Sequence, residues 1–95
     1  MNAALLEELS RLDGVEIAPS QWTGMPALWV DGREIVHAHD DWIEIRLTRK
    51  LITKLDDDRA AQRARTSDWV LVDAGERELI LELARRAVEA NRGAH

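Results

Sequence analysis

The sequence predicts an α+β fold, with helices packed on one face of a mainly antiparallel sheet of about five strands. Three observations favour this class. Short runs of alternating apolar and polar residues are separated by turn residues, leucine-rich helical runs lie near both ends of the chain, and a length of 95 residues suits one hydrophobic core. We therefore expect residues 1–95 to form a single two-layer domain.

The first part of the chain predicts a helix, a strand and a loop. Leucines recur at helical spacing over residues 3–12, so that they line one side of a helix. Residues 15–17 place a glutamate between two apolar residues, as in a half-buried strand. The stretch PSQWTGMP follows, and its two prolines and one glycine indicate a loop that carries Trp22.

The middle of the chain predicts two successive hairpins. Asp31-Gly32 separates ALWV from REIVHAH, and an Asp-Gly pair between extended runs favours a tight turn because both residues tolerate positive φ. Asp40-Asp41 separates the second run from WIEIRL, and this is a weaker turn because aspartate adopts positive φ less readily than glycine. Three adjacent antiparallel strands are therefore expected at the centre of the sheet.

The second half of the chain predicts further helices and one covered strand. Thr48 can cap a helix with an apolar stripe, and residues 56–65 either extend that helix through a kink or form a second one. The run WVLV at residues 69–72 is apolar on both sides and fits a covered strand. A final helix follows, whose apolar stripe runs from Leu79 to Val88.

Strand alternation divides the central residues between two faces. If Asp40-Asp41 is a two-residue turn, residues that face each other across the strand pair project to the same side. The core face is then expected to carry Trp29, Val36, Ala38, Ile43, Ile45 and Leu47. The other face is expected to carry Ile35, His37, His39, Trp42, Glu44 and Arg46, with Leu28 opposite Ile35 and Val30 opposite Arg33.

The pair His37 and His39 is the strongest candidate for chemistry. Two imidazoles on one side of a strand lie about 6 to 7 Å apart at their Cα atoms, so both can approach one ligand. Imidazole exchanges protons near neutral pH, Glu44 can hold the tautomer of His37, and Arg46 can neutralise an enolate, a carboxylate or a phosphate. We therefore expect the catalytic residues to be His37, His39 and Glu44, and the ligand-binding residues to be Leu28, Arg33, Ile35, Trp42 and Arg46.

Other interpretations of the same residues stay open. Histidines on a sheet face can simply be solvated. A mixed apolar and polar face also suits a protein–protein contact, so the chain can be a non-catalytic module that homodimerises. Finally, His37, His39 and Glu44 with water can ligate a metal ion, which would make the protein a metal-dependent oxygenase.

Composition narrows the classes of function. The net charge of −5 argues against a nucleic-acid partner, because binding to a phosphate backbone depends on lysine and arginine. No run approaches the ~20 apolar residues that cross a bilayer, so we expect a cytoplasmic protein with no membrane partner. The chain has no cysteine, and no serine lies in a nucleophile-elbow context, which argues against thiol chemistry and serine hydrolysis.

Two stretches of the chain carry a family resemblance: PALWVDGREIVHAHDDWIEIRLTRKL and DWVLVDAGERELILELARRAVEA. They resemble the small luciferase-domain family, which is named for a domain of fungal luciferase and is present as short bacterial proteins. The distinctive part is the Gly-Arg-Glu-x-x-His-x-His core at residues 32–39, and the resemblance covers residues 26–89. It implies oxygenase chemistry on a small planar acidic or enolic ligand, with the histidines as proton acceptors and no separate cofactor. The chain departs from the family pattern at Asp40-Asp41, where proline or glycine is common. The order of elements is also similar to the YjbR-like two-layer arrangement.

Overall fold

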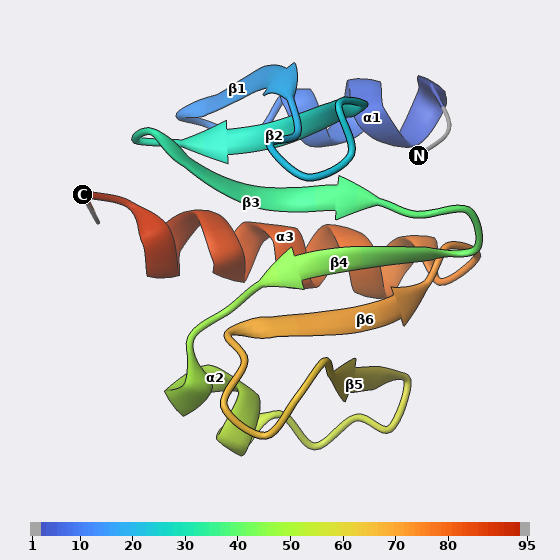
Figure 1. Cartoon of the computed structure of the whole chain (residues 1–95), viewed down its shortest axis with the longest axis vertical. Helices are drawn as coiled ribbons and strands as arrows, with labels where there is room; N and C mark the ends of the chain where they lie inside the picture. The colour runs from blue at the N-terminus through green and yellow to red at the C-terminus, as the bar shows by residue number, and fades with distance from the viewer. Residues whose placement is uncertain (1–2, 94–95) are drawn as a thin grey trace.

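The computed structural model of the chain describes residues 3–93 and confirms the α+β class (Figure 1). Within these residues six strands form one antiparallel sheet in the order β1-β2-β3-β4-β6-β5, slightly more strands than expected. The elements in chain order are α1 (Ala3–Ser10), β1 (Val15–Pro19), β2 (Pro26–Val30), β3 (Arg33–Ala38), β4 (Trp42–Arg46), α2 (Arg49–Lys54), β5 (Ala60–Gln62), β6 (Trp69–Asp73) and α3 (Arg77–Asn91).

Helices α1 and α3 pack on one face of the sheet, and the hydrophobic core lies between the two layers. Helix α3 crosses behind the sheet in Figure 1 and packs against β3 and β4, while α1 packs against β1 and α3. The fully buried members of the core include Leu9, Ile43, Ile45, Ile80 and Leu83. No helix in residues 3–93 combines the length and apolar character that a membrane span requires. We call the face opposite α1 and α3 the outer face.

Both expected hairpins form. In the first turn Asp31 has φ 50° and Gly32 has φ 79°, as a tight turn between twisted strands requires. In the second turn the His39 N–H donates to the Trp42 carbonyl over 2.8 Å, which closes the two-residue Asp40-Asp41 loop. The register beyond that loop pairs His37 with Glu44, so these residues project to the same side of the sheet, as predicted.

The register between β2 and β3 differs from the prediction because β3 contains a β-bulge. Trp29 pairs with Glu34, but the next pair is Leu28 with Val36, so Ile35 is one extra residue on β3. Ile35 and Val36 are both fully buried in the core cluster. The predicted pairing of Leu28 with Ile35 is therefore wrong.

The bulge moves several side chains to the face opposite the expected one. Leu28 and Ile35 belong to the core, so their predicted place beside the histidines is wrong. Trp29, expected in the core, instead faces Glu34, and its Nε1–H donates to the Ala18 carbonyl over 3.3 Å. Arg33 pairs with Val30 as predicted, but its guanidinium lies on the helical side, where Nη1 donates to Asn91 Oδ1 of α3 over 3.4 Å.

The segment between β4 and β6 holds one short helix and no second one. Thr48 caps α2 as expected, because its Oγ1 accepts from the Leu51 N–H at 3.1 Å. Residues 56–65 do not continue the helix; the Asp57 carboxylate accepts from the backbone N–H and the guanidinium of Arg59, and the chain then forms β5 on the open edge of β6. The helical interpretation of this segment is wrong, since pairing with β6 supplies hydrogen bonds that the sequence pattern could not reveal.

Candidate functional site

Two histidines and a glutamate converge on the outer face. His37 on β3 is 1% exposed, and the His39 side chain after it is 32% exposed. His37 Nε2 lies 3.4 Å and His39 Nε2 lies 2.6 Å from the same atom, Glu44 Oε1. One ligand atom from each of the three residues lies within 4.8 Å of the others. The predicted catalytic residues therefore form one compact group.

A second carboxylate, Glu34, completes what we call the histidine–glutamate cluster: His37, His39, Glu34 and Glu44. Glu34 is fully buried, and its Oε2 lies 3.0 Å from His37 Nδ1. The Ser20 hydroxyl donates to Oε2 over 2.6 Å, and the Gln21 N–H donates to Oε1 over 2.8 Å. Residues 34 and 37 would point to opposite faces of a regular strand, so only the bulge brings Glu34 beside His37.

Arg63, which follows β5, holds the outer oxygen of Glu44. Its Nε and Nη2 groups contact Glu44 Oε2 at 2.7 and 2.6 Å, which leaves Oε1 to the two histidines. Sequence reasoning missed both Glu34 and Arg63. The Gly-Arg-Glu part of the 32–39 motif was a signal for Glu34, but no local pattern indicated Arg63.

Burial lowers the pKa of His37 below its ordinary value, and the carboxylates of Glu44 and Glu34 oppose the shift without cancelling it. Each of these carboxylates already has donors of its own: Arg63 for Glu44, and Ser20 for Glu34. Neither ring nitrogen of His37 makes an aligned hydrogen bond within the described residues, despite its short distances to the carboxylates. Burial therefore favours the neutral ring, whose unprotonated nitrogen has no donor among the described residues.

Indole rings enclose the histidines. Trp22 and Trp69 lie with ring centroids 5.4 and 4.7 Å from that of His37, while Trp42 stacks on His39 at 4.9 Å. The prediction that Trp42 lies on this face is confirmed, and Trp22 and Trp69, which strand alternation did not place there, lie on it as well. Together with Arg63, these rings cover much of the face that the sequence suggested would be open.

Arg46 lies on the outer face as predicted, but it contacts Trp69 and not the histidines. Its guanidinium carbon is 5.2 Å from the Trp69 ring centroid, and Nη1 donates to the Glu34 carbonyl over 3.5 Å. Burial, and then the charge of Arg33, lower the pKa of Arg46. Of the predicted ligand-binding residues, the structure thus brings Trp42 to the cluster and Arg46 near it, and it places Leu28, Ile35 and Arg33 elsewhere.

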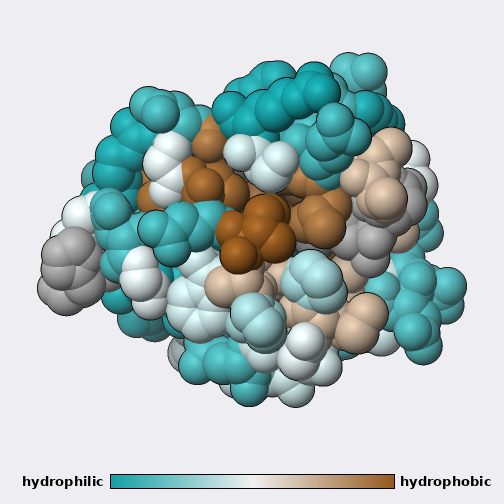
Figure 2. Space-filling view, turned by 90° about the horizontal axis from the view of Figure 1, so that it is seen from above, coloured by the Kyte–Doolittle hydropathy of each residue, from teal (hydrophilic) through white to brown (hydrophobic). Residues whose placement is uncertain are grey.

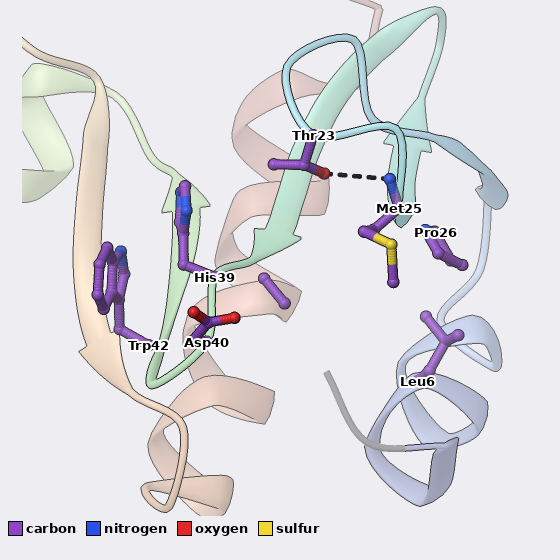
Figure 3. A pocket seen from close by; sticks show the side chains of 8 residues that line it. Leu6, Thr23, Met25, Pro26, His39, Asp40 and Trp42 are labelled. Carbon is purple, nitrogen blue, oxygen red and sulfur yellow. Dashed lines mark hydrogen bonds between the residues drawn. The ribbon is translucent and has the colours of Figure 1, made fainter.

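A pocket of about 430 Å³ opens beside His39. In Figure 3, His39, Asp40 and Trp42 line the β3–β4 side, while residues from α1 and the loop before β2 line the other side. A hydrogen bond of 3.2 Å from the Met25 N–H to Thr23 Oγ1 shapes that loop. Because His39 belongs to both the pocket and the cluster, a molecule in the pocket can reach the cluster through this ring.

Ser20 supports the loop and is not placed to act as a nucleophile. Its hydroxyl donates to Glu34 and accepts from the N–H groups of Trp22 and Thr23 at 3.1 and 3.2 Å. An activated serine requires a neighbouring base that is free to take its proton. Here the hydroxyl donates a hydrogen bond to Glu34, a buried carboxylate whose other oxygen accepts from the Gln21 N–H. The absence of a serine-hydrolase motif in the sequence agrees with this geometry.

The chain matches no family model, no curated protein and no solved structure in comparisons with each. The geometry itself must therefore indicate the chemistry. Two imidazoles, together with the Glu44 oxygen that Arg63 leaves to them, can hold a transition-metal ion or can transfer protons.

Proposed function

We propose that this protein binds one divalent transition-metal ion through His37, His39 and Glu44, and that it is a small metal-dependent oxygenase acting on a molecule in the adjacent pocket. The observation that carries the proposal is the convergence of both Nε2 atoms on Glu44 Oε1. An unprotonated ring nitrogen and a carboxylate oxygen are both acceptors, so where they approach each other a proton or a metal ion must lie between them, and one metal ion can serve both rings at once.

One of the distances within the group is that expected of two atoms sharing an ion, and all three ligand atoms lie within 4.8 Å of one another. Ligand atoms bound at about 2.1 Å with tetrahedral angles lie roughly 3.4 Å apart. The 3.4 Å between His37 Nε2 and Glu44 Oε1 agrees with that value. The 2.6 Å between His39 Nε2 and Glu44 Oε1 is a hydrogen-bond contact, which opens by less than about 1 Å when an ion replaces the shared proton.

The surroundings of the three ligands also resemble those of metal centres. Ligating histidines usually donate their second ring N–H to a carboxylate, and Glu34 is 3.0 Å from His37 Nδ1. Arg63 restrains Glu44 through Oε2, so that Oε1 alone faces the histidines. With three protein ligands, positions remain for water, dioxygen or substrate on the His39 side, which is the exposed side.

The donor set favours a transition metal over Mg²⁺ or Ca²⁺, because those ions prefer oxygen ligands. Two histidines and one carboxylate occur in catalytic zinc sites and in non-haem Fe(II) oxygenases. The second class matches the oxygenase chemistry that the resemblance to the luciferase-domain family implies, although that resemblance implies no separate cofactor. When bound, Fe²⁺ would supply the one-electron chemistry that dioxygen requires.

The test is metal content together with ligand replacement. Tag-free protein is stripped with a chelator, reloaded anaerobically with Fe²⁺ and separately with Zn²⁺ and Mn²⁺, and analysed for metal by mass spectrometry. We expect one ion per chain in the wild type and in Glu16→Gln, an exposed β1 residue that serves as the matched control. His37→Gln, His39→Gln and Glu44→Gln should each lose stoichiometric binding.

Two results would contradict the proposal. One is a wild type that binds less than one equivalent of every ion tested. The other is binding that survives all three replacements, because the ion would then sit elsewhere. Tetrahedral or five-coordinate absorption bands of Co²⁺-loaded protein, lost in the same variants, provide a second and independent readout.

One observation favours a metal-free alternative, in which the pair acts as acid and base. Glu34, His37, Glu44 and His39 contact one another in sequence, so a proton at His39 could be relayed toward the buried end of the cluster. This is the mechanism that the family resemblance implies, without a separate cofactor. It is favoured if chelator-treated protein retains ligand turnover and elemental analysis finds no metal.

A further inference from the structure

We infer that the pocket beside His39 takes a small molecule with an ammonium group on an apolar or aromatic body, and that Asp40 pairs with the ammonium. The inference deepens the proposed function by naming the class of its substrate, and it rests on that function only for the step after binding. It is drawn from the walls of the pocket, their charge and their position relative to the histidine–glutamate cluster.

The wall opposite His39 is apolar. Leu6 of α1, Met25 just before β2 and Pro26 at its start form it, and Ala38 of β3 also lines the pocket. Met25 is 62% exposed, so a ligand that covers this side chain would remove a large apolar surface from water. Figure 2, which views the end of the molecule that carries β1 and α1, shows apolar residues gathered at the centre of that surface with polar residues around them.

The charge of the pocket is negative. Among the residues of 3–93 that line it, Asp40 is the only Asp, Glu, Lys or Arg. In Figure 3 the Asp40 carboxylate points into the pocket, and it makes no hydrogen bond or ion pair with another residue in 3–93. Glu44 lies beyond His39, and the net charge of the chain is −5, so the potential around the pocket favours a cation.

Trp42 provides a second feature suited to a cation. Its ring stacks on His39 and is 39% exposed beside the pocket, which leaves indole surface available to an ammonium group. An acidic ligand would find no Lys or Arg side chain among the lining residues that the structure describes. Arg46, which could pair with an anion, lies at the other end of β4 against Trp69.

The test compares three probes of similar size and different charge. Metal-free, ¹⁵N-labelled protein is titrated with 2-phenylethylamine, 2-phenylethanol and 3-phenylpropanoate, and the backbone amides of residues 23–25 and 38–42 are followed by NMR. We expect the amine to bind about two- to fivefold more tightly than the alcohol, as for a partly exposed ion pair, and the anion to bind most weakly. The preference for the amine should decrease at high salt.

Asp40→Asn should abolish that preference, while Asp41→Asn should keep it. Asp41 is the matched control because it is the neighbouring exposed carboxylate and does not line the pocket. The inference is overturned if the anion binds best, if the preference survives Asp40→Asn, or if no probe shifts these amides. Because the titration uses metal-free protein, its failure leaves the metal proposal intact, and a failure to bind metal leaves the titration valid.

Discussion

Replacing Glu34 by Gln tests the position of the β3 bulge and the role of the second carboxylate together. The side chain keeps its size, but the negative charge is lost from a fully buried site. Glu34 accepts two short hydrogen bonds, at 2.6 Å from Ser20 Oγ and at 2.8 Å from the Gln21 N–H. A glutamine has one acceptor oxygen, so its NH₂ group must face one of these donors.

The expected loss of stability follows from these two bonds. Hydrogen bonds to charged groups contribute about 1.5–3 kcal/mol and neutral ones about 0.5–1.5 kcal/mol, so neutralisation weakens each bond by about 1 kcal/mol. The free energy of unfolding of the metal-free protein should fall by about 2 kcal/mol, which lowers the midpoint of thermal unfolding by roughly 8–16 °C in a domain of this size. Metal affinity should fall about 10- to 100-fold, because Glu34 lies 3.0 Å from His37 Nδ1, where its carboxylate would orient the ring of a ligating histidine.

Urea unfolding followed by tryptophan fluorescence measures the first effect, and competition with a chromophoric chelator measures the second. The dependence of the unfolding free energy on urea should be unchanged, since the surface exposed on unfolding is the same. Glu16→Gln is the matched control, because Glu16 is an exposed carboxylate in β1 that pairs with Trp29. It should change the free energy by less than about 0.5 kcal/mol.

The reasoning is refuted if Glu34→Gln matches the wild type in both stability and metal affinity. That result would mean that the carboxylate is solvated and distant from His37. The bulge would then have to lie elsewhere in β3, and His37 would have no carboxylate to orient it.

Three further predictions concern pH, the core and the first hairpin. Burial places the pKa of folded His37 below that of His37 in the unfolded chain, so the unfolded state binds the proton first as the pH falls. The free energy of unfolding should therefore decline below about pH 6.5 by up to about 1.4 kcal/mol per pH unit. In urea unfolding of the metal-free protein, His37→Gln should lack the contribution of His37 to this pH dependence. Ile45→Ala leaves a cavity at a fully buried position of β4 and should lower the unfolding free energy by about 2–5 kcal/mol, with the same assay as the check. Gly32→Ala places a Cβ on a residue with φ 79° and should lower the unfolding free energy by about 1–2 kcal/mol, even though the added methyl would meet no heavy atom within 4 Å. An unchanged urea midpoint would contradict the turn geometry.

The sequence by itself determined the class of fold and the outward direction of five side chains. His37, His39, Trp42, Glu44 and Arg46 all lie on the outer face, because strand alternation and the closure of the Asp40-Asp41 loop are local properties. The Asp-Gly turn and the Thr48 cap were predictable for the same reason. Each depends on residues within a few positions of one another.

Tertiary structure alone decided which groups join the two histidines. The bulge at Ile35 depends on how β2 and β3 fit over the core, and it brings Glu34 to the outer face while it takes Leu28 and Ile35 into the interior. Trp22, Arg63 and Trp69 reach the site from segments far apart in the chain. Periodicity describes the direction of a side chain within one strand, whereas these contacts depend on pairing and packing between elements, which no local pattern encodes.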